Sequence, residues 1–170
     1  LLIDMPQKQS QKIFDFKDPF LIYTKNINQI MQSILSCIQS KNVYLKGFDV
    51  YKEYVDEVLD EIGFCIKSPL LKENDFLIID NLEDFKEVKA LQCIVIVIIE
   101  QLNFKDISLI KSFTERMAYQ INDIESLRYF FDGYPIHQNT QHPQILYEHA
   151  VYECVLNKGH PLKKKNKKQI

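Results

Sequence analysis

The stretch Asp75–Asp84 (DFLIIDNLED) is where the sequence comes closest to catalytic chemistry. Four apolar residues followed by Asp80 predict a buried strand that ends in a carboxylate. An ATPase presents the acid that orders its Mg²⁺ at a strand end, but any internal strand of a Rossmann-type sheet can end in the same way. The first interpretation therefore depends on whether a phosphate-binding loop accompanies the acid.

No phosphate-binding loop of a known type is present in the sequence. A P-loop uses glycines to bring backbone N–H groups to the phosphates, and it places a Lys and a hydroxyl for charge and metal. The chain has four glycines, and none precedes a Lys-Ser or Lys-Thr pair. Gly47 alone follows a predicted strand, with bulky residues after it, so a dinucleotide-binding GxGxxG is excluded too. An atypical nucleotide site would have to use Gly47, Asp80 and Ser112.

Metal and nucleophile chemistry have little support in the sequence. His149 and Glu153 have the i, i+4 spacing of helical metal ligands, but no HExxH motif accompanies them. The four cysteines form no CxxC, and each lies in an apolar stretch that predicts a buried free thiol in a reducing compartment. A GxSxG elbow is also missing. We therefore expect no catalytic residue, no metal and no cofactor.

Strand and helix patterns alternate along the chain, which has 170 residues, 46% of them hydrophobic. This alternation predicts an α/β domain with a Rossmann-like parallel sheet, abbreviated, and helices on both faces. We expect an extended arm with one strand-like piece at 1–24, the domain at 25–160 and a basic disordered tail at 161–170. The predicted strands are 42–46, 64–67, 76–80 and 106–110. The predicted helices are 26–40 (an addition to the sheet fold), 50–62, 83–103 (with a strand at 93–99 as the alternative) and 146–156, and 121–144 is expected to be irregular.

Two segments carry a resemblance to a known family. They are His142-Pro-Gln-Ile-Leu146 leading into Cys154–Gly159, and Asp75–Asp84 followed by Glu87-Val88. Over residues 42–160 the chain resembles the degenerate short-chain dehydrogenase/epimerase-like region at the amino terminus of the adenylate kinase 7 family of motile cilia. His149 and Glu153 stand where this alignment expects the Tyr and Lys of YxxxK. The resemblance therefore implies a pseudoenzyme in an axonemal assembly.

Charge is distributed unevenly along the chain. The net charge is −2, and five of the positive charges lie in Lys163–Lys168, which leaves −7 for residues 1–162. An acidic body argues against a DNA-binding domain, whereas the lysines suit an acidic surface such as tubulin, RNA or anionic lipid. The longest apolar run is too short to span a bilayer, and no signal peptide is recognisable, so a cytoplasmic or ciliary location is expected.

The sequence thus predicts a non-catalytic scaffold or adaptor domain that binds other proteins of a large assembly. The residues expected to contact partners lie in the arm, in an aromatic loop and in the tail: Phe14, Phe16, Phe20, Tyr129, Phe130, Phe131, Tyr134, Lys163, Lys164 and Lys165. One alternative is a regulatory domain that binds NAD(P) or ATP at an atypical site. A further alternative is a degenerate ATPase related to replication initiators, based on the strand ending at Asp80 and the Tyr44–Gly47 turn.

Overall fold

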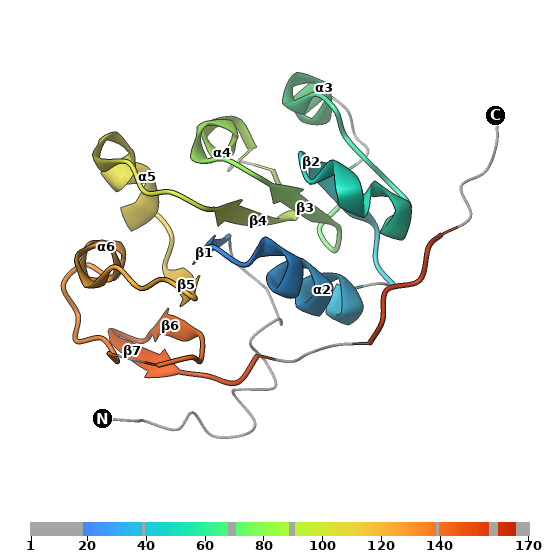
Figure 1. Cartoon of the computed structure of the whole chain (residues 1–170). Coiled ribbons are helices and arrows are strands. Elements are labelled where there is room, and N and C mark those ends of the chain that lie inside the picture. Colours follow the sequence, from blue (N-terminus) through green and yellow to red (C-terminus); the bar gives the residue numbers. More distant parts are fainter. Residues whose placement is uncertain are drawn as a thin grey trace.

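Strand β1, Phe20–Thr24, lies at the centre of the sheet, with β4 (Ile94–Ile99) on one side and β5 (Glu115–Tyr119) on the other. The structure is a computed structural model that describes residues 19–38, 40–67, 71–88, 91–138, 140–156 and 160–165. The seven strands follow the order β2-β3-β4-β1-β5-β6-β7 (Figure 1). All five residues of β1 are buried, as expected of an internal strand covered on both faces.

The first five strands are parallel, and the last two extend the sheet as an antiparallel hairpin. Strands β2 (Val43–Lys46) and β3 (Phe76–Ile79) complete the parallel part. The hairpin consists of β6 (Gln144–Tyr147) and β7 (Ala150–Glu153). The predicted Rossmann-like α/β class is confirmed.

The helices divide between the two faces in an unequal way (Figure 1). Helix α2 (Ile27–Ile38) and the 3₁₀ helix η1 (Asp49–Tyr54) pack on one face. The opposite face carries α3 (Ile62–Lys67), α4 (Leu82–Val88), α5 (Ile107–Lys111) and α6 (Ile124–Phe130). The short 3₁₀ helix η2 (Phe104–Asp106) precedes α5.

Strand order explains this division. The connection from β1 to β2 runs toward one edge of the sheet, whereas those from β2 to β3, β3 to β4 and β4 to β5 run back in the opposite direction. Parallel crossovers are almost always right-handed, so a reversal of direction moves the crossover helix to the other face. Helix α2, predicted at 26–40 as an addition to the sheet fold, is therefore its first crossover helix.

Two predictions at the centre of the sheet need correction. The arm predicted at 1–24 is wrong for Phe20–Thr24, because these residues pair with β4 and β5 and belong to the domain. The long helix predicted at 83–103 is wrong as well: α4 ends at Val88 and the chain returns as β4. The alternative of a strand at 93–99 is confirmed. The run of β-branched residues in Ile94–Ile99 suits a strand that is buried on both sides.

Other predicted elements are also wrong. The helix predicted at 50–62 is only the 3₁₀ turn η1, and the strand predicted at 64–67 is helix α3. The strand predicted at 106–110 is helix α5, and the irregular segment predicted at 121–144 contains α6. Strand β5 had no counterpart in the prediction. Short apolar runs fit either period, so tertiary packing decides these cases.

The helix predicted at 146–156 is a β-hairpin. Its turn residues Glu148 and His149 have φ values of 47° and 66°, which is the left-handed conformation that two-residue hairpin turns require. The Tyr-Lys positions of the family resemblance therefore fall on a turn and a strand, not on a helix face.

The end of the described chain packs against the body. The backbone N–H of Lys165 donates to the carbonyl of Glu53 at 2.8 Å, and its ammonium contacts Asp56 at 2.9 Å. Lys164 pairs with Glu53 at 3.3 Å, and Leu162 packs on the core beneath α2. The prediction of a disordered tail is wrong for residues 161–165, and the rest of that tail lies outside the described residues. In the described part of the chain, no helix has the length and apolar character needed to cross a membrane.

Candidate functional site at the carboxyl edge of the sheet

A cavity of about 570 Å³ opens at the carboxyl ends of β3 and β4, next to the start of α2. The connection leaving β1 and the connection leaving β4 run in opposite directions over opposite faces of the sheet. Such a reversal separates the loops at the carboxyl edge, and open α/β sheets bind their ligands in the crevice that results. This crevice is therefore the candidate site.

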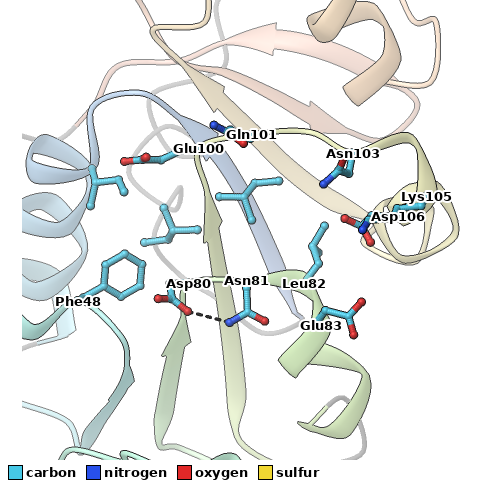
Figure 2. Close-up of a pocket in the computed structure, with 13 residues that line it drawn as sticks. Phe48, Asp80, Asn81, Leu82, Glu83, Glu100, Gln101, Asn103, Lys105 and Asp106 are labelled. Carbon is cyan, nitrogen blue, oxygen red and sulfur yellow. Dashed lines mark hydrogen bonds between the residues drawn. The ribbon is translucent and has the colours of Figure 1, made fainter.

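The crevice has an apolar floor and a polar rim. The floor consists of Ile27, Phe48, Leu82, Ile98 and Ile99. The rim consists of Asp80, Asn81, Glu83, Glu100, Gln101, Asn103, Lys105 and Asp106. Figure 2 shows Phe48 on one side of the cavity and Glu83, Lys105 and Asp106 on the other, with Asp80 and Asn81 between them.

Two of the three residues proposed for an atypical nucleotide site, Gly47 and Asp80, are neighbours, and Asp80 lines this crevice. Gly47 follows β2 and Asp80 follows β3, and the parallel pairing of these strands brings the two loops together. Asp80 accepts a hydrogen bond from the side-chain amide of Asn81 at 2.8 Å. Ser112 lies elsewhere, at the end of α5, where its hydroxyl donates to the carbonyl of Leu109. The structure therefore supports Gly47 and Asp80 as neighbours and separates Ser112 from them.

Phe48 occupies part of the space beside Asp80. Gly47 and Phe48 have φ values of 85° and 56°, both in the left-handed region, which is uncommon for a phenylalanine. This backbone turns the Phe48 ring toward the cavity, where it packs against the core beneath α2 (Figure 2). The bulky segment after Gly47 thus forms one wall of the crevice.

The connection from β1 to α2 is only Lys25-Asn26, too short for a six-residue phosphate cradle. Asn26 acts as the N-cap of α2: its side-chain oxygen accepts from the backbone N–H of Gln29 at 3.3 Å. Its own N–H donates to the Thr24 hydroxyl at 2.9 Å, and its amide donates to Gln120 at 3.2 Å. One backbone N–H of the helix N-terminus, where an anion could otherwise bind, is thus already taken by a side chain of the protein.

The ammonium of Lys25 donates to the backbone carbonyl of Glu100, the residue that follows β4. Sequence reasoning missed Lys25, Asn26 and Glu100. The sequence did carry a signal for strand β1: the apolar run Phe20–Tyr23 is flanked by Pro19 on one side and by the polar pair Lys25-Asn26 on the other, as a strand would be.

The charge of the crevice is strongly negative. Four carboxylates line it, from Asp80, Glu83, Glu100 and Asp106, and Lys105 is the one cation among the lining residues. Lys25 adds a second cation beside the crevice, at the Glu100 carbonyl, so the carboxylates still outnumber the cations. Like charges repel, so this rim disfavours a polyphosphate and favours a cationic group. Among the described residues, no group of three or more His, Cys, Asp or Glu side chains is arranged to hold a metal ion.

Several residues predicted to contact partners are buried instead. Phe20, Phe130 and Phe131 are at most 1% exposed and belong to the core, so their assignment to partner contacts is wrong. Tyr129 and Tyr134 keep part of their surface. Phe14 and Phe16 lie outside the described residues. Lys163 is exposed, whereas Lys164 and Lys165 pair with the body.

The thiols offer no activated nucleophile. Cys65, Cys93 and Cys154 are buried, and burial raises the pKa of Cys93 and of Cys154 to about 12. Cys37 is exposed, contrary to the prediction of burial, although partial burial of its thiol raises its pKa. Because the thiolate is the reactive form, none of these environments activates a cysteine.

Comparison with known proteins supports the fold. No protein-family profile matches the sequence, and no curated protein matches it. Among solved structures, the conjugation coupling protein TcpA of pCW3, in its monomer form with ATPγS, superposes with a TM-score of 0.51. The identity is 12%, over 82% of this chain and 61% of TcpA, so the chain spans less than two thirds of that protein. At this identity the likeness shows the α/β fold alone.

Proposed function

We propose that this chain is a non-catalytic binding module of a larger protein assembly, whose crevice receives a basic segment of a partner and not a nucleotide phosphate. The observation that carries the proposal is the connection from β1 to α2. This connection has only two residues, which is too short for a phosphate-binding loop. Asn26 caps helix α2, and the Lys25 ammonium is hydrogen-bonded to the Glu100 carbonyl. The ciliary setting implied by the sequence resemblance stays a prediction.

The charge of the crevice supports the same proposal. A lysine or arginine side chain would place its alkyl stem on the apolar floor beside Phe48 and its charge near Asp80 and Glu100. An arginine could also lie against the Phe48 ring, because a guanidinium is attracted to an aromatic face. The surplus of carboxylates on the rim favours the cation in both contacts.

Site-specific photocrosslinking tests the partner assignment. A photoreactive residue at Gln101, an uncharged lining residue of the crevice, is compared with one at Glu73, an exposed position in the turn before β3 at the opposite edge of the sheet. We expect adducts identifiable by mass spectrometry from position 101 and none from position 73. Equal labelling at both positions would contradict a partner site in the crevice.

A nucleotide-binding regulatory domain is the second candidate function, favoured by the meeting of Gly47 and Asp80 beside a crevice at the switch point. Its test is the melting temperature with millimolar ATP, ADP, NAD⁺ or NADPH, with and without Mg²⁺. A ligand at about 100 times its Kd stabilises by about 2.7 kcal/mol. For a chain of this size each kcal/mol raises the melting temperature by about 2–4 °C. We expect no shift, and a shift lost in Lys105→Ala would establish the second candidate.

A further inference from the structure

Phe104 presents its ring to solvent on the short 3₁₀ helix η2 and is 80% exposed, more than any other large apolar side chain described. The ring is held in place by an edge-to-face contact with Tyr129, with centroids 4.9 Å apart and an interplanar angle of 73°. The Tyr129 hydroxyl donates to the carbonyl of Phe104 at 3.3 Å. An aromatic ring that is both exposed and held by a neighbour is a typical anchor of a protein interface.

A groove of about 280 Å³ lies beside this ring, between η2 and α6. Leu102, Phe104 and Tyr129 supply its apolar surface, and Asp123, Glu125 and Ser126 supply its polar edge. None of its lining residues is basic. Asp106 lies on the same turn as Phe104 and adds a carboxylate near the groove. Burial first and this carboxylate second raise the pKa of the Tyr129 phenol.

We propose that this groove docks a short segment of a partner protein in which one large apolar side chain is flanked by lysine or arginine. The apolar side chain would pack between Phe104 and Tyr129, and the flanking cations would face Asp123 and Glu125. Complementary charge around an apolar centre is the usual arrangement of a specific interface. This inference rests on the proposed function, because it defines the chemistry of the partner segment.

Two further observations favour a basic partner. Residues 1–162 carry a net charge of −7, which attracts basic segments over long range. The chain's own basic residues Lys164 and Lys165 pair with Glu53 and Asp56 beside η1, on the face of the sheet opposite α6. These two lysines therefore do not neutralise the carboxylates of the groove.

The groove and the crevice are neighbours. Lys105 and Asp106 of η2 line the crevice, while Phe104 of the same turn lines the groove. Figure 2 shows Lys105 and Asp106 at the edge of the crevice. A single partner segment that crosses η2 would therefore meet an apolar anchor site on one side and an acidic site on the other.

A random library of 12-residue displayed peptides is the probe. Peptides are selected on the full chain, counter-selected on the immobilisation surface alone, synthesised, and measured by fluorescence anisotropy. We expect the selected peptides to share an aromatic or large aliphatic residue next to Lys or Arg. Their affinity should fall by about tenfold or more on Phe104→Ala, the loss typical of an interface anchor. On Glu125→Lys it should also fall, and its salt dependence should weaken.

The matched control is Val155→Ala, which removes an exposed apolar side chain (66% exposed) outside the groove and should leave affinity unchanged. Melting temperatures of all variants verify folding. The proposal would be overturned if no peptide is enriched, if the enriched peptides are acidic, or if they bind Phe104→Ala as tightly as the unchanged chain. Asp80→Asn separates the two proposals: loss of binding on Phe104→Ala with full binding on Asp80→Asn supports the groove and contradicts the crevice as partner site.

Discussion

Asp80 approaches Gly47 so closely that a Cβ atom on the glycine would lie 2.2 Å from the Asp80 carboxylate oxygen Oδ2. The glycine also has a φ of 85°, which other residues adopt only with strain. A side chain at residue 47 would therefore force the Asp80 carboxylate to move, and with it the arrangement of the two loops that follow β2 and β3 beside the crevice.

Gly47→Ala should destabilise the protein by about 2 kcal/mol, the order of cost for a strained left-handed residue with a steric conflict. The free energy of unfolding from urea titration measures it. Gly63→Ala is the control, because nothing lies within 4 Å of its Cβ position and it belongs to helix α3. That change should be neutral or stabilise by up to about 1 kcal/mol.

The double variant Gly47→Ala/Asp80→Ala separates two contributions to the loss in unfolding free energy: the steric conflict with Asp80 and the unfavourable φ of residue 47. Removing the carboxylate should restore only part of the lost stability, because the φ of residue 47 stays unfavourable for alanine. Full recovery would mean that the conflict with Asp80 is the whole effect, and no recovery would contradict the contact itself.

Arg116 is a buried cation whose removal should be costly. It is 3% exposed, donates to the carbonyls of Phe113 and Phe130, and pairs with Asp132 at 2.8 Å. Arg116→Leu leaves these carbonyls without their donor, so we expect a loss of about 3 kcal/mol in unfolding free energy. Asp132→Asn removes the counter-charge of the buried guanidinium but should cost less than Arg116→Leu, because asparagine keeps an acceptor for Arg116 and tolerates the φ of 55° at this position. Equal losses from the two variants would contradict this account.

The hairpin turn predicts opposite effects for two Glu→Gly substitutions. Glu148 has a φ of 47°, so Glu148→Gly should stabilise the protein by about 1 kcal/mol. Glu87 is exposed in helix α4, so Glu87→Gly should destabilise it, by up to about 1 kcal/mol. Thermal melting measures both. If residues 146–156 formed the helix that the sequence pattern predicts, both substitutions would destabilise.

Thiol accessibility distinguishes Cys37 from the other three cysteines. Cys65, Cys93 and Cys154 are buried, and the pKa values of Cys93 and Cys154 are raised to about 12, so few of these thiols form thiolate at pH 8. Titration of the native protein with a chromogenic disulfide reagent should therefore show one rapid thiol, and four after denaturation. Cys37→Ser should abolish the rapid phase, and a second rapid thiol would contradict the burial described.

The most distinct periodic pattern in the chain predicted correctly the helix that became α2. Its apolar residues recur at helical spacing over about three turns, so one face is buried. Strand β3 was equally clear, because four apolar residues end at a polar pair. The predictions for 64–67 and 106–110 were wrong because four or five residues are too few to separate a helical from a strand period.

The crevice was only partly predictable. Gly47 and Asp80 were found from their place after predicted strands, and parallel pairing brought them together. Lys25, Asn26 and Glu100 were missed because β1 was assigned to an arm and β4 to a helix, so the ends of these strands had no place in the predicted sheet. The anchor Phe104 could not be recognised either, since exposure of a single phenylalanine is a property of its surroundings.

The sequence by itself determined the class of the protein and the lack of a standard phosphate-binding motif, because alternating apolar segments and glycine positions are local features. Tertiary structure alone decided which strand lies at the centre of the sheet and which carboxylates share the crevice. It also decided that α2 crosses on the face opposite to helices α3 to α6. These features depend on strand order, and strand order is set by contacts between residues far apart in the chain, such as those of β1 with β4 and β5. No local pattern encodes such pairings, since each buried strand has the same apolar character as its neighbours.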